Sequence, residues 1–499
     1  MTSMTKQQST PSAANPRAVL AVTCVALATV VSAVASLNVA IPSIAREIHA
    51  SQTQLSWIID AYALAFASLL LLGGAIGDRY GRRRALVAGL VVFGAGSVAA
   101  MTVDSPGWLI AMRAVLGVGA ALVMPATLST VTSTFPHAQR ARAVGTWAGV
   151  AGASAILGLL TSGVLLEWWS WRSVFGLNIL LAVIATVATI RVVPESADPE
   201  APRLDVTGAL IAVVGLAALV YAIIEAPTEG WGSARTLVLL AVGVVVLAGF
   251  VLWELRTANP LLDPRLFKVG AFTAGTASLT LQFFAFFGFI FLLLQYLQLV
   301  LGDSPLIAAL SLIPMAFGMM PAARVIAPRL VDKAGTRITC AIGLVLAAGS
   351  LAWLSRLDAD SSYWWLVVGL VPLGAGMGLA MTPATAAVTD ALPADKQGVG
   401  SAMNDLSREL GGALGIAVLG SVLQSIYRNN LDLGNVPSGL ADRARESLAL
   451  ALHAGGDLAS RAQGSFVDGM QAALLVGAGA VLVAAAVVAV VSRTRRQKA

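Results

Sequence analysis

The sequence predicts an all-α polytopic membrane protein with fourteen transmembrane helices. Of its 499 residues, 57% are hydrophobic and only 12% are charged, and the mean hydropathy is +0.82, whereas soluble domains carry about 25% charged residues. The charges gather between apolar runs that are long enough to cross roughly 30 Å of hydrocarbon as helices. Runs such as residues 474–491 are apolar throughout, which excludes the alternating pattern of a β-barrel and favours helices.

The apolar runs define the predicted spans in chain order. They are 18–41, 55–77, 84–103, 107–130, 142–166, 171–193, 205–225, 235–254, 271–300, 304–327, 337–356, 363–388, 398–425 and 466–492. Residues 1–17 are polar and lead into the first span without a cleavage site, so we expect a tail there rather than a signal peptide. Residues 493–499 form a second expected tail, and residues 426–465 form the longest expected extramembrane segment.

The basic residues predict the orientation. Counting residues at the span ends with the adjoining connection, 22 of the 32 Lys and Arg fall in the tails and even-numbered connections and eight in the odd-numbered connections, while two, Arg113 and Arg408, lie well inside spans. The positive-inside rule therefore places both termini in the cytoplasm, with residues 426–465 outside the cell. Anionic lipid facing the basic loops accounts for the net charge of +6, so nucleic acid is not needed as a partner.

An internal repeat predicts two six-helix halves. GAIGDRYGRRR (74–84) follows the second span and PRLVDKAGTR (328–337) follows the tenth, and their Asp, basic and Gly positions superpose on a shift of 254 residues. We expect an N-terminal half at 18–193, a C-terminal half at 271–492 and two inserted helices at 205–254. Parallel halves of this kind are typical of transporters whose substrate cavity lies between the repeats.

The two repeated turns are candidates for a cytoplasmic gate. A carboxylate beside a basic residue and flanked by glycines suits a latch that closes two helices together. Arg82, Arg83 and Arg84 can pair with carboxylates or with lipid phosphates on the cytoplasmic face. The alternative is that these arginines only set the topology. The gate candidates are Gly74, Asp78, Arg79, Gly81, Arg82, Arg83, Asp332, Lys333, Gly335 and Arg337.

The turn at 74–84 resembles the signature between helices 2 and 3 of the major facilitator superfamily, and LIAMRAVLGVGAA (109–121) resembles its helix-4 Arg motif. WIIDAY (57–62), YLQLVLGDSPLIAAL (296–310) and SRELGGALGIAVLGSV (407–422) together resemble its fourteen-helix drug:proton antiporter branch. This resemblance implies secondary active export of hydrophobic or cationic drugs or antibiotics in exchange for protons.

Two positions depart from the pattern of that branch. Ala33 stands where the branch usually carries an acidic residue in helix 1. In GLLTSG (158–163) Gly158 is kept, but Leu159 replaces the proline and Ser162 the first of two later glycines. These departures favour, as the alternative function, a same-fold exporter of a metabolite, a lipid or a self-made antibiotic with different coupling.

Ionisable residues inside spans are costly and are therefore functional candidates. Asp405 and Glu409 are four residues apart in the thirteenth span, which places both carboxylates on one helix face. Such a pair can carry protons and, when ionised, bind a cationic substrate. The alternative is structural pairing with Arg408 or with a neighbouring helix.

Asp60 and Arg113 form a second candidate set. The predicted span limits place them at similar depths, about 8–9 Å from the outer ends of their helices. We expect the two side chains to form an ion pair, and we expect protonation of Asp60 to break this pair and so to be coupled to opening of the transporter. A permanent salt bridge and snorkelling of Arg113 to the surface are the alternatives.

Polar and aromatic residues of the ninth span are candidates for a pocket that takes flat apolar cations. They are Gln282, Phe286, Gln295 and Tyr296, although a phenylalanine run that faces lipid is an equal alternative.

Other function classes fit poorly. His49, His137 and His453 all lie outside the spans, no His/Cys/Asp cluster has the spacing of a metal site, and GxxxxGK[ST] is absent, which argues against a membrane enzyme or an ATPase. We therefore expect a non-enzymatic monomer in the inner cell membrane, without cofactor or metal. Its expected partners are a lipophilic small molecule, protons and lipids. A membrane sensor or scaffold is the less favoured reading.

Overall fold

The computed structural model describes residues 15–198, 204–392, 397–434, 436–453 and 455–491, so most of the two predicted tails lies outside the described residues. Within these ranges, fourteen helices are long and apolar enough to cross a membrane, which confirms the predicted spans. The helical elements are α1 (Pro16–Glu47), α2 (Gln52–Tyr80), α3 (Arg82–Thr102), α4 (Pro106–Thr134), α5 (His137–Trp168), α6 (Arg172–Val192), α7 (Val206–Glu229), α8 (Ala234–Glu254), η1 (Pro264–Lys268), α9 (Gly270–Gln295), η2 (Tyr296–Val300), α10 (Pro305–Leu310), α11 (Ile313–Pro321), η3 (Ala322–Ile326), α12 (Ala327–Ala334), α13 (Thr336–Leu354), α14 (Tyr363–Asp390), α15 (Gln397–Asn430), α16 (Ser438–Glu446), α17 (Leu448–Leu452) and α18 (Gly456–Val491).

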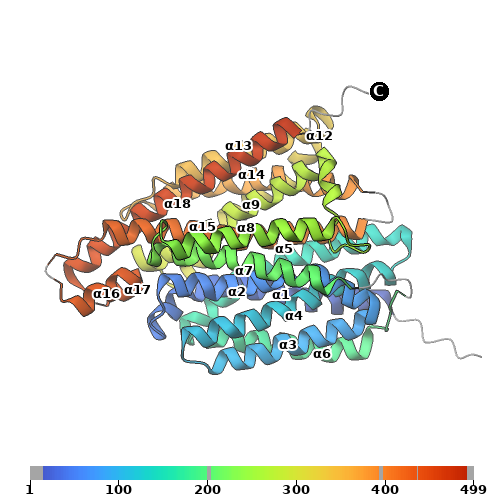
Figure 1. Ribbon diagram of the computed structural model, residues 1–499, viewed down its shortest axis with the longest axis horizontal. Coiled ribbons are helices and arrows are strands. Elements are labelled where there is room, and N and C mark those ends of the chain that lie inside the picture. The colour runs from blue at the N-terminus through green and yellow to red at the C-terminus, as the bar shows by residue number, and fades with distance from the viewer. Residues whose placement is uncertain (1–14, 199–203, 393–396, 435, 454, 492–499) are drawn as a thin grey trace, which may run out of the picture.

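The helices run side by side along the long axis of the molecule (Figure 1). We call the end that carries the turns at Gly81 and Gly335 and the end of α18 the terminal face. The opposite end, which carries α16 and α17, is the distal face. In Figure 1 the terminal face is on the right, α16 and α17 are at the left, α1 to α4 and α6 lie in the lower part, and α9, α13, α14 and α18 lie in the upper part.

Each half is held together by close helix packing. In the first half α2 packs along α4 and α1 along α5, and in the second half α9 packs along α15 and α13 along α14. Small residues permit these approaches. A Cβ on Gly415 of α15 would lie 2.0 Å from the carbonyl oxygen of Phe284 on α9, so the two backbones touch at a distance that only glycine allows.

The two halves meet at the distal face. The side chain of Gln298 in η2 donates to the carbonyl oxygen of Val39 on α1 over 3.0 Å, and Ser304 bonds Glu167 of α5. Gly420 of α15 lies against Ser56 of α2. α4 and α14, the fourth helices of the two halves, make their extensive contacts within their own halves.

The inserted helices pack against the line where the halves meet. α7 and α8 pair with each other, and α7 also contacts both α2 and α15. α8 lies on the outside, with 11% of its most apolar window buried. The inserted pair is therefore joined to both halves through α7.

Two segments differ from the predicted spans. The tenth span is not one regular helix but is divided into α10, α11, the π-helix η3 and α12. The segment 426–465 is shorter outside the helices than expected, since α15 continues to Asn430 and α18 begins at Gly456. Between them α16 and α17 form the two short helices of a distal cap, and Tyr427 donates to the carbonyl oxygen of Ala444 over 2.6 Å. Helix continuation satisfies backbone groups that an irregular loop beside lipid leaves unpaired.

Candidate functional site

The carboxylates of α15 are unpaired in the interior of the bundle. Asp405 and Glu409 are half-buried, and neither makes a hydrogen bond or ion pair with another described residue. Arg408, the alternative partner, lies over the ring of Phe283 on α9, with its guanidinium carbon 4.8 Å from the ring centroid. The two carboxylates therefore interact with Arg408 only electrostatically, without a close ion pair, and remain available to bind a proton or a cation.

The helix that carries these carboxylates contacts both halves of the protein. α15 contacts α9 within its own half and α2 of the first half. Tyr62 of α2 is fully buried and lies within electrostatic range of both Glu409 and Arg113. One member of each candidate set, Glu409 and Arg113, thus lies near one tyrosine where the halves meet.

Asp60 and Arg113 are both buried, at 0% and 1% exposure, but they form no ion pair in this structure. The Nε of Arg113 donates to the carbonyl oxygen of Ile58 over 2.9 Å, and its guanidinium lies 4.4 Å from the ring centroid of Tyr62. Both oxygens of Asp60 are without a hydrogen-bond partner among the described residues. The predicted pair is not formed in this conformation, because the guanidinium of Arg113 faces α2 but is held by the Ile58 carbonyl and the Tyr62 ring instead.

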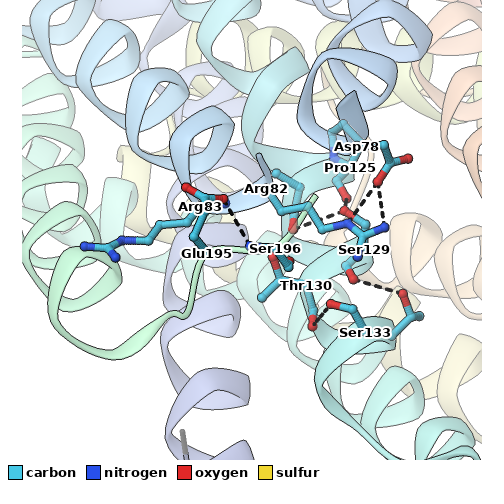
Figure 2. Close-up of polar contacts among 11 residues, drawn as sticks. Asp78, Arg82, Arg83, Pro125, Ser129, Thr130, Ser133, Glu195 and Ser196 are labelled. Carbon is cyan, nitrogen blue, oxygen red and sulfur yellow. Dashed lines mark hydrogen bonds and ion pairs between the residues drawn. The ribbon is translucent and has the colours of Figure 1, made fainter. Parts of the chain in front are cut away.

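The turn between α2 and α3 is built around Asp78 and Arg82 (Figure 2). The Nε of Arg82 donates to an oxygen of Asp78 over 2.9 Å, four residues away. Gly81 between the helices has φ of +119°, a conformation that residues with a Cβ rarely adopt. Gly74, one turn before Asp78, lies against Pro125 of α4. The repeated glycines of the motif therefore serve a tight turn and a close helix approach.

The segment after α6 holds this turn in place, which the sequence analysis did not anticipate. The backbone N–H of Arg82 donates to the carbonyl oxygen of Ser196 over 2.8 Å, and the N–H of Arg83 donates to the carboxylate of Glu195 over 3.2 Å. The side chain of Arg83 bonds the carbonyl oxygen of Ile190 over 2.7 Å. These partners lie at the end of α6 and in the segment that follows it. The available sequence signal was Glu195, a carboxylate just after the sixth span and on the same side as the basic turn. The sequence did not specify that Glu195 contacts this turn.

The second copy of the turn also contains a glycine with positive φ, but it makes different bonds. Gly335 has φ of +84°, which matches Gly81 and supports the internal repeat. Across the described part of the chain, Asp332, Lys333 and Arg337 form no ion pair with one another. Arg79 of the first copy lies 5.8 Å from the ring centroid of Tyr80.

The four pocket candidates do not form one pocket. The amide of Gln282 donates to the carbonyl oxygen of Met377 on α14 over 2.9 Å, and Phe286 belongs to a ring cluster with Phe283 and Phe287. Gln295 bonds within its own helix. Gln295 and Tyr296 are adjacent and lie about 20 Å further along the helix than Gln282.

Tyr296 belongs to the distal face. It donates to the carbonyl oxygen of Asp358 over 2.6 Å and lines a separate cavity of about 370 Å³. Sequence proximity on one helix therefore grouped residues that packing places at two different sites.

The two departures in α1 and α5 lie beside each other. Ala33 is buried at 1% exposure. Ser162 donates to the carbonyl oxygen of Ser36 on α1 over 2.7 Å, and Gly158 lies against the backbone of Ser32, one turn away. The serine that replaces a glycine thus binds α5 to α1 in the first half.

Comparison with known proteins gives the family. The sequence matches the Major Facilitator Superfamily over residues 21–416. It is 35% identical to the multidrug efflux pump LfrA of Mycolicibacterium smegmatis, with 92% of each chain covered. It is 33% identical to the multidrug resistance protein Stp of Mycobacterium tuberculosis, over 88% of this chain and 85% of Stp. It is 32% identical to the tetracenomycin C resistance and export protein of Streptomyces glaucescens, over 90% and 86%.

Solved structures agree on the fold. A bacterial homologue of the human lysosomal transporter Spinster, crystallised in an inward-facing and unoccupied conformation, superposes with a TM-score of 0.66 at 16% identity. The match covers 96% of this chain and 97% of that one. Together with the fourteen spans and the sequence identities, this similarity shows that the chain is a multi-pass membrane protein of the major facilitator superfamily.

Proposed function

We propose that the protein exports lipophilic, often cationic, drugs or antibiotics in exchange for protons, by alternating access between its two halves. The observation that carries the proposal is the unpaired, half-buried carboxylate pair Asp405 and Glu409 on a helix that contacts both halves. Relatives named as multidrug resistance and efflux proteins support the cargo class. No enzymatic step is part of this function.

In the proposed cycle, the terminal face is cytoplasmic and the distal face lies outside the cell membrane. Contacts at the distal face correspond to the state that is closed outside. In this state cargo enters from the cytoplasm or the inner leaflet and lies near Glu409 and Asp405. When the distal face opens, an external proton neutralises a carboxylate and the cationic cargo is released. Cysteine labelling at the two faces of intact cells tests the orientation.

Asp60 and Arg113 are proposed as the second part of the coupling. A buried carboxylate without a partner is unfavourable when charged, so we infer that Asp60 carries a proton in the present arrangement. Loss of that proton then favours a move toward Arg113, which has two nitrogens without partners in the described structure. The proposed site therefore has two states, one with protonated Asp60 apart from Arg113 and one with deprotonated Asp60 paired with Arg113.

The test is efflux of a fluorescent lipophilic cation from everted vesicles, with and without a collapsed proton gradient. Glu409→Gln and Asp405→Asn remove the charges and keep the shapes, and Asp360→Asn on the distal surface is the matched control. We expect gradient-driven transport to be lost in at least one α15 variant, while passive exchange of the cation is kept. Full gradient-driven transport in both α15 variants at normal protein level contradicts the coupling site, and absence of any cation movement in the parent protein contradicts the cargo class.

A narrower cargo is the second candidate function. Ala33 removes the helix-1 acid of the drug:proton branch, and one relative is named for tetracenomycin C resistance and export. In this second function, the protein exports a single antibiotic or metabolite, and the export is not coupled to protons in the way proposed above. A growth panel of structurally unrelated antibiotics separates the two, because multidrug export protects against several classes and the narrow exporter against one.

A further inference from the structure

A groove of about 390 Å³ lies between the inserted helices α7 and α8, close to the terminal face. The residues that line it are Ile211, Val246, Gly249, Leu252, Trp253 and Arg256. Toward the distal side the helices close together, since a Cβ on Gly243 would lie 2.9 Å from the backbone of Leu219. Leu252 and Trp253 are 57% and 40% exposed, so the groove opens to the surroundings of the protein.

The walls of the groove form an apolar track along α8. Val246, Gly249 and Leu252 recur every three residues and therefore lie on one helix face. A Cβ on Gly249 would meet no atom within 4 Å, so this glycine leaves the groove open rather than serving a close helix contact. From Val246 to Arg256 the track is about 15 Å long, which suits part of an acyl chain.

The mouth of the groove is polar and is held in position. The indole N–H of Trp253 donates to a carboxylate oxygen of Asp205 over 2.9 Å. The same carboxylate accepts from the N–H of Gly208 over 2.8 Å, so it is satisfied within the protein. Arg256 is exposed and makes no ion pair or side-chain hydrogen bond with another described residue. One free guanidinium thus stands at the end of an apolar track.

We propose that this groove binds one anionic phospholipid, with an acyl chain along Val246 and Gly249 and the phosphate at Arg256. Guanidinium groups bind phosphate through paired, charge-assisted hydrogen bonds, and Trp and Arg side chains are typical of the membrane interface. Basic pockets between membrane helices select anionic head groups. The positive charge disfavours the lipophilic cations proposed as cargo, so this site is distinct from the carboxylates of α15.

The position of the groove gives the lipid a structural role. α7 contacts α2 of the first half and α15 of the second, so a lipid bound between α7 and α8 stabilises the pair that rests on both halves. The inference does not depend on which substrate is exported.

The test is native mass spectrometry of the full-length protein in detergent, titrated with phosphatidylglycerol or with phosphatidylcholine of the same chains. We expect one phosphatidylglycerol to bind at least about tenfold more tightly than phosphatidylcholine, from the strength of hydrogen bonds to charged groups. Arg256→Gln removes this preference, and Gly249→Leu, which fills the open track, weakens both lipids.

Two controls make matched changes elsewhere. Arg329→Gln removes an exposed arginine of α12, and Gly479→Leu enlarges a glycine of α18 whose Cβ also meets open space; both are expected to bind like the parent protein. Equal affinity of the parent protein for the two lipids overturns the proposal, as does unchanged phosphatidylglycerol binding in both groove variants. A failure of drug efflux leaves this readout unaffected, so the two proposals fail separately.

Discussion

The indole N–H of Trp57 on α2 donates to the carboxylate of Glu225 on α7 over 3.1 Å. About half a turn earlier on α7, the carbonyl oxygen of Ile223 accepts from the hydroxyl of Ser421 on α15 over 2.6 Å. One turn of the inserted helix is therefore bonded to both halves of the protein. In the proposed cycle, separation of α2 from α15 at the distal face breaks or strains one of these two bonds.

The hydrogen bond from Trp57 to Glu225 is expected to stabilise the conformation seen in this structure. Trp57→Phe keeps an aromatic ring beside Tyr221 but leaves Glu225 without its donor, so we expect a loss of about 1 kcal/mol and a lower midpoint of thermal unfolding in detergent. Trp364→Phe, at an exposed tryptophan of α14, makes the same change without a bond to lose. Equal midpoints for the two variants contradict the role of the bond.

Asp78→Asn is expected to separate gating from stability. The Asp78 and Arg82 side chains are 41% and 18% exposed, and such pairs contribute under about 1 kcal/mol. We expect nearly unchanged thermal stability but at least a tenfold loss of efflux, because the proposed gate needs the charge. Asp332→Asn in the second turn, where no ion pair to Lys333 or Arg337 forms, is the comparison. Efflux at the parental rate for Asp78→Asn contradicts the gate.

Gly415→Ala is expected to disrupt the pairing of α9 and α15. The added Cβ would lie 2.0 Å from the carbonyl oxygen of Phe284, so the helices must move apart, at a cost of about 1–3 kcal/mol. Size-exclusion profiles and thermal unfolding measure the loss. Gly349→Ala on α13 adds the same methyl where nothing lies within 4 Å and is expected to leave stability unchanged; equal behaviour of both variants contradicts the packing argument.

Asp303, in the connection between η2 and α10, predicts a pH dependence of stability. Burial raises the pKa of the Asp303 carboxyl above its ordinary value. Its contribution to folding is therefore fully present below the pKa of the unfolded chain and is lost as pH rises through the folded pKa. Asp303→Asn should raise the unfolding midpoint at neutral pH, and the gain should shrink as pH falls. A gain that grows toward acid pH contradicts the sign.

Much of the fold followed from local properties of the chain. Each span is apolar over its own length, so the hydrophobic effect identifies it without knowledge of its neighbours, and all fourteen appear in the structure. The repeated turns were also predictable, because Gly81 and Gly335 allow backbone angles that few other residues adopt. The i, i+4 spacing of Asp405 and Glu409 placed both on one face of α15 for the same local reason.

The partners of these elements depend on tertiary packing. It set Arg113 on Ile58 and Tyr62 rather than on Asp60, Glu195 on the turn at Arg83, and α7 between α2 and α15. These contacts join residues that are about 50 to 200 positions apart. Their geometry depends on how whole helices rotate and cross, to which many side chains contribute at once, and no local pattern in the sequence encodes that sum. Local sequence patterns indicate which segments cross the membrane and where charge lies along each helix, whereas packing determines which charges meet.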